Sequence, residues 1–277
     1  MVLMTACGVL LAVGLIAAWR WSGLEFRPPP DDEGRRDVVR PFLWHVTVAV
    51  VAGLGAGILV AGAGGRLLMR LLAVTSPEDA QGRITEADEV VGEITVGGTI
   101  GFLVFTGLFF GLITGAVYVL VRRWLPAGRL GGLAFGALLL VVAGTRIEPL
   151  RADNPDFDIV GPSWVALIAF SALVLAHGVL VAALAARYAS TLPLLTLEPR
   201  SLALYAPLLL LLPAVFPVVG LILVGLMVVG LSRVEPIRAA LRAPRTTVVG
   251  RVILVAAALV ALPGFVTAVS DIADRGP

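Results

Sequence analysis

Lysine is absent from this 277-residue chain, and cysteine occurs once, at Cys7. Without lysine the protein can form neither a retinal or pyridoxal Schiff base nor a P-loop, whose phosphate cradle requires GxxxxGK. A single cysteine excludes an internal disulfide and a thiolate metal site. Nucleic-acid binding has no support either, because the 21 basic residues are all arginines dispersed between apolar segments rather than gathered on one face.

Charge is also scarce. Charged residues make up 14% of the chain and hydrophobic residues 58%, with a mean hydropathy of +0.98. A soluble domain carries roughly 25% charged residues, so this composition is typical of an integral membrane protein.

The long apolar runs predict an all-α fold, a polytopic bundle of transmembrane helices with seven to eight hydrophobic segments. A helix needs roughly 20 apolar residues to cross a bilayer. The expected segments are 2–19, 42–64, 96–121, 130–145, 163–187, 202–215, 217–232 and 247–270.

The stretch 202–232 is too long for one ordinary span and too short for two, and it contains Pro207, Pro213 and Pro217. We expect a proline-broken hairpin there; the alternative is one crossing. Loops 20–41 and 233–246 are rich in arginine, which is typical of cytoplasmic loops. Both lie on the cytoplasmic side only if 202–232 turns back, and this favours the hairpin.

With this topology the chain begins outside the cytoplasm, and 20–41 is a cytoplasmic linker. Loops 65–95 and 145–162 and the C-terminal tail then form an acidic extracytoplasmic cap. These segments hold most of the 19 acidic residues: Glu78, Asp79, Glu86, Asp88, Glu89, Glu93, Glu148, Asp153, Asp156, Asp158, Asp271 and Asp274.

Small residues at four-residue spacing predict close helix packing, because in lipid helices gain little from hydrophobic burial against each other. One stripe comprises Gly53, Gly57, Ala61 and Gly65, and another includes Gly107, Gly111 and Gly115. We expect the second and third spans to pack tightly through these stripes. A hinge or a narrow pore lining is the alternative use of such glycines.

Four arginines near the outer surface are candidates for binding a lipid phosphate or another anion, since a guanidinium matches phosphate in a bidentate way: Arg66, Arg70, Arg146 and Arg151. The run "RLLMRLLAV" continues the second helix toward the interface. "TSPEDAQ" and "TEADE" each have a hydroxyl followed by acids, which predicts a helix start.

The motif "DNPDFD" places Asp153, Asp156 and Asp158 close together as hard oxygen ligands, which suit Ca²⁺ or Mg²⁺. The spacing matches no complete EF-hand loop. The alternative is a turn-rich loop whose acids pair with the nearby arginines, and it is favoured over the metal site.

His177 lies within a span and His45 near the start of another. Two such histidines raise the question of haem, but His45 is too near the membrane boundary for a good fit. We expect no cofactor, and we expect His177 to make an ordinary hydrogen bond between helices.

The stretches "EADEVVGEITVGGTIGF" and "TRIEPLRADNPDFDIVGP" resemble polytopic membrane proteins of high-GC Gram-positive bacteria to which no activity is attached. The resemblance implies a multi-pass protein of a bacterial inner membrane and transfers no catalytic residue. The complete replacement of lysine by arginine is compatible with a high-GC genome.

Three functions remain open. The first is a structural or accessory membrane subunit, in contact with lipids and with a protein partner or a second copy. The second is a small-solute channel or carrier that uses the hairpin. The third is an outer-leaflet lipid-handling enzyme with arginine on phosphate and aspartate on a metal. The central parts of the clear spans hold no carboxylate, which disfavours a simple proton-coupled carrier, and enzymatic activity is not favoured.

Overall fold

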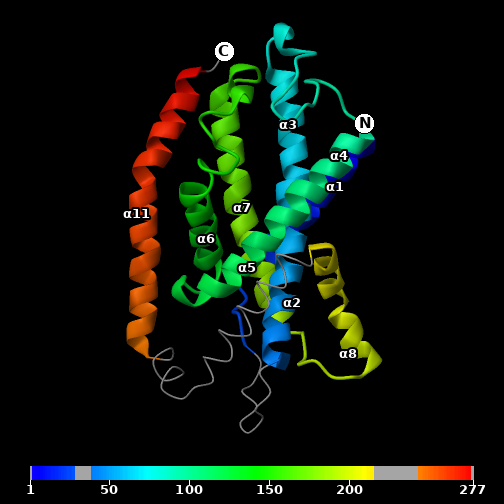
Figure 1. The fold of residues 1–277 in the computed structure, drawn as a ribbon, viewed down its shortest axis with the longest axis vertical. Coiled ribbons are helices and arrows are strands. Elements are labelled where there is room, and N and C mark those ends of the chain that lie inside the picture. Colours follow the sequence, from blue (N-terminus) through cyan, green and yellow to red (C-terminus); the bar gives the residue numbers. More distant parts are fainter. Residues whose placement is uncertain (1, 29–38, 215–242, 276–277) are drawn as a thin grey trace.

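The computed structural model describes residues 2–28, 39–214 and 243–275 and shows a bundle of helices (Figure 1). Within these residues the only β pairing is an isolated bridge between Ile84 and Val90. The helices are α1 Val2–Trp21, α2 Val39–Ala56, α3 Ala63–Thr75, α4 Val96–Phe102, α5 Gly111–Val121, α6 Arg129–Val142, α7 Ser163–Ala189, α8 Pro199–Leu204 and α11 Pro244–Arg275.

Two of the spans are long rods interrupted by π-helical turns. The π-helix η1, Gly57–Gly62, joins α2 to α3, and η3, Leu103–Phe110, joins α4 to α5. The first rod runs over 37 residues from Val39 to Thr75, about 55 Å of helix, which exceeds a bilayer core of about 30 Å. The helix therefore continues past the end expected at residue 64, and the segment that links the two rods is 76–95.

Five of the described helices are long and apolar enough to cross a membrane: Val2–Trp21, Val39–Thr75, Val96–Trp124, Ser163–Ala189 and Arg245–Arg275. Helix α6 is apolar but has only 14 residues. Of the hairpin expected at 202–232, the structure describes the end of α8 and a 3₁₀ helix, η6 Ala206–Ala214; the expected turn lies outside the described residues. The described part of the chain thus reaches neither seven nor eight spans.

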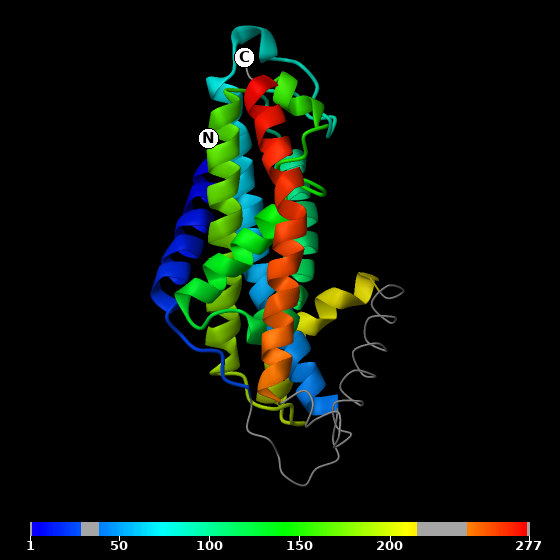
Figure 2. The same cartoon turned by 90° about the vertical axis from the view of Figure 1, so that its left-hand side faces the viewer.

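The two ends of the bundle are built from different segments. One end carries the loops 76–95 and 143–162, the start of α1 and the end of α11 (Figures 1 and 2). The other end carries the end of α7 and the start of α11, together with the starts of α2 and α6. The end of α7 and the start of α11 therefore lie at the same end of the bundle.

Glycines bring the two rods into backbone contact. A Cβ atom on Gly53 would collide with the carbonyl oxygen of Gly111, one on Gly57 with that of Gly107, and one on Gly115 with that of Ala49. The contact includes the π-helical turns of both rods, η1 and η3. Gly65 lies further along, where its Cβ would stand 3.0 Å from the Phe102 ring. Any side chain at the central positions would force the rods apart.

A second glycine contact joins α6 to α7. A Cβ on Gly178 would collide with the backbone of Gly136, and one on Gly132 would stand 2.7 Å from Cα of Val179. This contact between α6 and α7 was not predicted from the sequence. Because small residues let backbones pack directly, this close approach to α7 stabilises α6 in spite of its short length.

The main core lies between α2, α5, α6 and α7. Trp44 is fully buried, and its indole N–H donates to the Leu192 carbonyl over 2.9 Å. The rings of Tyr118 and Phe135 pack edge to face at 5.2 Å. Near the start of α2, the Arg122 guanidinium lies 3.5 Å above the ring of Phe26, which itself contacts Trp44. These aromatic contacts fix the end of the bundle opposite the acidic loops.

Candidate functional site

In the structure the acidic cap consists of the loops 76–95 and 143–162 together with the end of α11, and the two loops pack together as one folded layer. Ile159 joins Ala73, Ala80 and Val91 in a small apolar cluster. The loops are also joined through Gly161, whose carbonyl accepts from the Thr75 hydroxyl at 2.9 Å and whose N–H donates to the Ser76 hydroxyl at 3.1 Å. The cap therefore docks on the protruding end of α3 through both apolar and polar contacts.

Below these contacts, a second apolar cluster anchors the 143–162 loop to the spans. Leu150 and Phe157 are buried beside Leu72, and Ile272 from the end of α11 reaches the same cluster. The loop is thus held by side chains from two helices that are far apart in sequence. This anchoring places the polar side chains of the loop above the bundle rather than in it.

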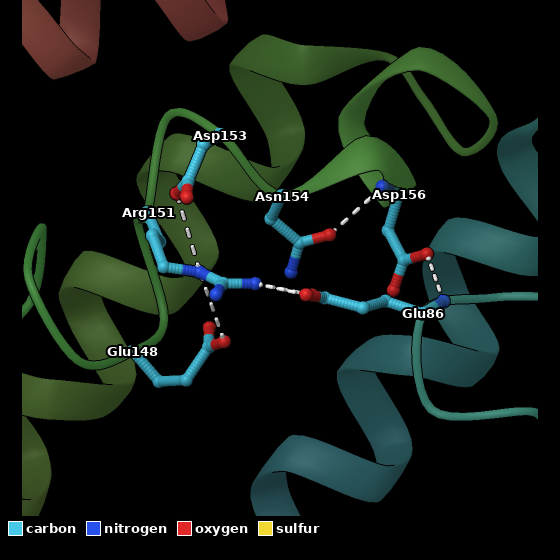
Figure 3. A network of polar contacts seen from close by, with 6 residues as sticks. All are labelled: Glu86, Glu148, Arg151, Asp153, Asn154 and Asp156. Carbon is cyan, nitrogen blue, oxygen red and sulfur yellow. Dashed lines mark hydrogen bonds and ion pairs between the residues drawn. The ribbon is translucent and has the colours of Figure 1, made fainter.

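Arg151 is the centre of a charge network that joins the two loops (Figure 3). Its guanidinium forms a close ion pair with both carboxylate oxygens of Glu86, and its Nε lies 3.3 Å from Asp153 and 3.7 Å from Glu148. The hydrogen bond to Glu86 is the main reason that the pKa of Arg151 is raised above its usual value. Its side chain is 27% exposed, so water screens the network in part.

Asp156 makes the second link between the loops. Its carboxylate accepts the backbone N–H of Glu86 at 2.8 Å, and the Asn154 side chain accepts the Asp156 N–H at 2.8 Å (Figure 3). Burial raises the pKa of Asp156, and the hydrogen bond from Glu86 acts in the opposite direction. Burial also raises the pKa of Glu148, while Arg151 opposes that change. These carboxylates therefore serve the docking of the loops.

The three aspartates considered as metal ligands have separate surroundings. Asp153 faces Arg151, Asp156 faces the backbone of Glu86, and Asp158 is exposed. Within the described residues, no group of three or more His, Cys, Asp or Glu side chains is placed to hold a metal ion. Asp153 instead pairs with Arg151, as expected from the alternative interpretation in which loop acids pair with nearby arginines.

The 76–95 segment contains a tight turn where the sequence analysis expected helix starts. The "TSPEDAQ" stretch forms only a three-residue 3₁₀ turn, Glu78–Ala80. The "TEADE" stretch lies inside the turn closed by the Ile84–Val90 bridge, so the prediction of a helix there is wrong. The reversal uses Gly82, Asp88 and Gly92 with positive φ, a backbone conformation that favours glycine and tolerates aspartate.

Arg66 is a buried residue of α3 and does not reach the surface. It is 8% exposed, its Nε donates to the Thr99 hydroxyl at 3.2 Å, and its Nη2 has no hydrogen-bond partner. Thr99 in turn donates to the Thr95 carbonyl at 2.8 Å. Arg66 therefore joins α3 to α4 inside the bundle.

The other two arginines of the candidate set contact backbone. Arg70 is half-buried and donates to the Gly92 carbonyl at 3.0 Å, which holds the end of the turn against α3. Arg146 is exposed and donates to the Val142 carbonyl at 2.9 Å, at the end of α6. Only Arg151 of the four enters the charge network.

His177 lies in the core of the bundle, where its Nε2 is 2.8 Å from the Thr114 hydroxyl. This contact joins α7 to α5 and is the hydrogen bond between helices expected from the sequence. His45 has different neighbours: its Nδ1 lies 2.7 Å from the Pro41 carbonyl, and its ring packs on Trp44.

Two partners in these sites were missed by sequence reasoning. Glu86 is 65 residues from Arg151 in the chain, and Thr99 is 33 residues from Arg66. Nothing in a single sequence pairs residues at such separations. A signal was present only for Arg70 and Arg66, whose spacing of four places both on one side of a helix.

No family model, curated protein or solved structure matches the chain. The class therefore follows from the chain itself. The five long apolar helices make it a multi-pass membrane protein with an all-helical fold, and an acidic cap covers one end of the bundle.

Proposed function

We propose that the protein is a structural or accessory subunit of a bacterial inner membrane, and that its acidic cap contacts a protein partner outside the cytoplasm. The observation that carries this proposal is the Arg151–Glu86–Asp156 linkage, which fixes two loops into one surface. A preformed surface loses little entropy on binding, which favours association.

The outward-facing acids of the cap give that surface its character. Exposed carboxylates surround the linkage on both loops and at the end of α11: Glu78, Asp79, Asp88, Glu93, Asp153, Asp158, Asp271 and Asp274. Exposed Ile84 and Ile147 lie on the same two loops. A partner with a basic surface and an apolar contact point complements this combination.

The interior of the bundle supports a subunit over a carrier. The rods touch through glycine backbones, and the polar groups His177 and Thr114 contact each other. A carrier needs two arrangements of its helices around a solute site. The two rods, and α6 with α7, are instead packed through direct backbone contact, and His177 and Thr114 contact each other between α7 and α5.

The lipid-handling alternative gains less support, because it needs aspartates that converge on a metal beside a free arginine. Asp156 is bound to the Glu86 backbone, and Arg151 is shared among three carboxylates. No particular contact in the cap favours catalysis.

The distribution of arginine supports the proposed orientation. The ends of α1 and α5 and the starts of α6 and α11 lie at the end of the bundle opposite the cap (Figure 1). These segments hold Arg20, Arg122, Arg129 and Arg245, and arginine-rich short loops typically remain in the cytoplasm. In the proposed orientation the N-terminus and the cap therefore lie outside. The resemblance to membrane proteins of high-GC Gram-positive bacteria supports the inner-membrane address.

Cross-linking in native membranes, followed by purification in mild detergent, tests the proposal. We expect a stable partner that is lost from the Asp79→Lys, Asp158→Lys double variant and retained by Glu198→Lys, a similar charge reversal in the segment after α7. Solute flux through proteoliposomes of the purified protein alone would contradict the proposal. So would a partner that remains bound to the double variant.

A further inference from the structure

A cavity of about 590 Å³ opens at the end of the bundle opposite the acidic cap. Its lining comes from three helices that are distant in sequence: the end of α1, the start of α6 and the end of α7. The lining residues are Trp19, Arg20, Trp21, Leu24, Arg129, Arg187 and Ser190. The cavity is wide open to the surface, so a ligand would be contacted from one side only.

The lining contains three guanidinium groups and no carboxylate. Among the described residues, none of Arg20, Arg129 and Arg187 forms an ion pair like those of Arg151 in the cap. All three guanidinium groups would attract an anion bound in this cavity. The fork geometry of arginine favours an anion that accepts two hydrogen bonds at once, such as a phosphate.

The tryptophans indicate where the cavity lies relative to lipid. Trp19 is 73% exposed at the end of a span, and Trp21 lies beneath Arg187, whose guanidinium is 5.9 Å from the ring centroid. Tryptophan at a helix end is typical of the membrane–water interface, where phospholipid headgroups lie. Leu24 adds an exposed apolar contact beside the arginines.

We propose that this cavity binds a phosphate-bearing ligand, the headgroup of an anionic phospholipid, through Arg20, Arg129 and Arg187. The position of the cavity at a span end brings a headgroup within reach while its acyl chains stay in the bilayer. A soluble phosphate monoester offers the same chemistry, so the test separates the two sources. The site is distinct from the cap and does not depend on the proposed subunit role.

The test uses the full-length protein, depleted of lipid by detergent exchange. Tryptophan fluorescence is followed while phosphatidylglycerol, phosphatidylcholine or glycerol 1-phosphate is added, since Trp19 and Trp21 line the cavity. We expect saturable binding of phosphatidylglycerol and far weaker binding of phosphatidylcholine, whose choline group adds a positive charge. Saturation by glycerol 1-phosphate at equal concentration would support the phosphate site and assign it to a soluble ligand.

Matched variants distinguish a built site from general positive charge. Arg129→Gln and Arg187→Gln should each weaken binding by about tenfold, the loss expected for a charged hydrogen bond. Arg187→Lys keeps the charge without the fork and should give a smaller loss. Arg245→Gln removes a charge from an exposed residue at the same end but outside the cavity, and it should leave binding unchanged.

Two outcomes would overturn the proposal. One is the absence of saturable binding by either phosphate ligand. The other is an equal loss from Arg245→Gln and the cavity variants, which would mean that diffuse charge alone attracts the lipid. Melting curves of each variant confirm folding, and if the Gln variants fail to fold, Arg187→Lys and Arg129→Lys carry the same comparison.

Discussion

The two ends of the bundle treat their charges in opposite ways. In the cap, Arg151 is shared by Glu86, Glu148 and Asp153, and the loops fold around that network. At the other end Arg20, Arg129 and Arg187 surround an open cavity without a carboxylate in its lining. The ion pairs of Arg151 hold the two loops of the cap in one conformation. Within the part of the chain that the structure describes, the three cavity arginines have no such partners, so they remain able to bind an external anion.

The largest effect is expected from the glycine contact between the two rods, which lies between the two ends of the bundle. Gly111→Leu would insert a side chain against the Gly53 carbonyl and should destabilise the protein by about 3 kcal/mol or prevent folding. Gly101→Leu lies on the same rod with open space around its Cβ position and should have little effect. Thermal melting in detergent measures both, and equal melting temperatures would contradict the packing.

Removing the centre of the cap network should have the next largest effect. Arg151→Gln leaves Glu86, Glu148 and Asp153 close together without their cation, and the loss of stability should be modest because water screens this partly exposed network. The 76–95 loop should become more sensitive to protease. Arg146→Gln, an exposed arginine of the same loop that contacts only backbone, is the control; equal protease sensitivity in both variants would argue against the network.

At the opposite end, removing an arginine should not weaken the fold. Arg129 occupies the first turn of α6, where the helix dipole disfavours a positive charge. In lipid-free detergent, Arg129→Gln should leave stability within about 0.5 kcal/mol of the parent, or raise it slightly. Chemical or thermal unfolding provides the measurement. A loss as large as that of Arg151→Gln would erase the difference between the two ends.

The smallest effect concerns pH in the cap. Burial raises the pKa of Asp156 above its usual 3.8. Between pH 3.8 and this raised pKa, the folded protein therefore keeps a proton on Asp156 that the unfolded chain has lost. Stability from this group is therefore highest below pH 3.8 and falls as pH rises through the interval up to the raised pKa. Asp156→Asn removes this dependence.

The difference between parent and Asp156→Asn melting temperatures isolates the effect. The parent should gain stability relative to the variant as pH falls from 7 toward 4. A difference that is constant with pH, or that changes in the opposite direction, would rule out the role assigned to burial.

Local patterns in the sequence predicted some contacts and missed others. The four-residue spacing of Gly53 and Gly57 pointed to a close helix contact, because spacing along one helix defines a face. The helix runs past residue 64 to Thr75, as the run "RLLMRLLAV" predicted, and Leu68 and Leu72 continue its buried side. The spacing of the apolar residues, rather than the mean hydropathy of the segment, indicated that the helix continues.

The cap was harder to predict because its contacts join residues far apart in the chain. "TEADE" has the composition of a helix start, but the bridge between Ile84 and Val90 turns it back on itself. Positive φ at Asp88 and Gly92 is compatible with that turn, and the sequence alone could not choose between the two. The cavity was missed for the same reason: Arg20, Arg129 and Arg187 meet only after three helices have packed.

The most direct test of the account is the side of the membrane on which each end lies. Single cysteines introduced by Asp158→Cys and Arg245→Cys, in a Cys7→Ala background, can be labelled with an impermeant maleimide in sealed right-side-out vesicles. The account predicts labelling of the Asp158→Cys protein before lysis and of the Arg245→Cys protein only after it. The reverse pattern, or labelling of both in intact vesicles, would contradict it.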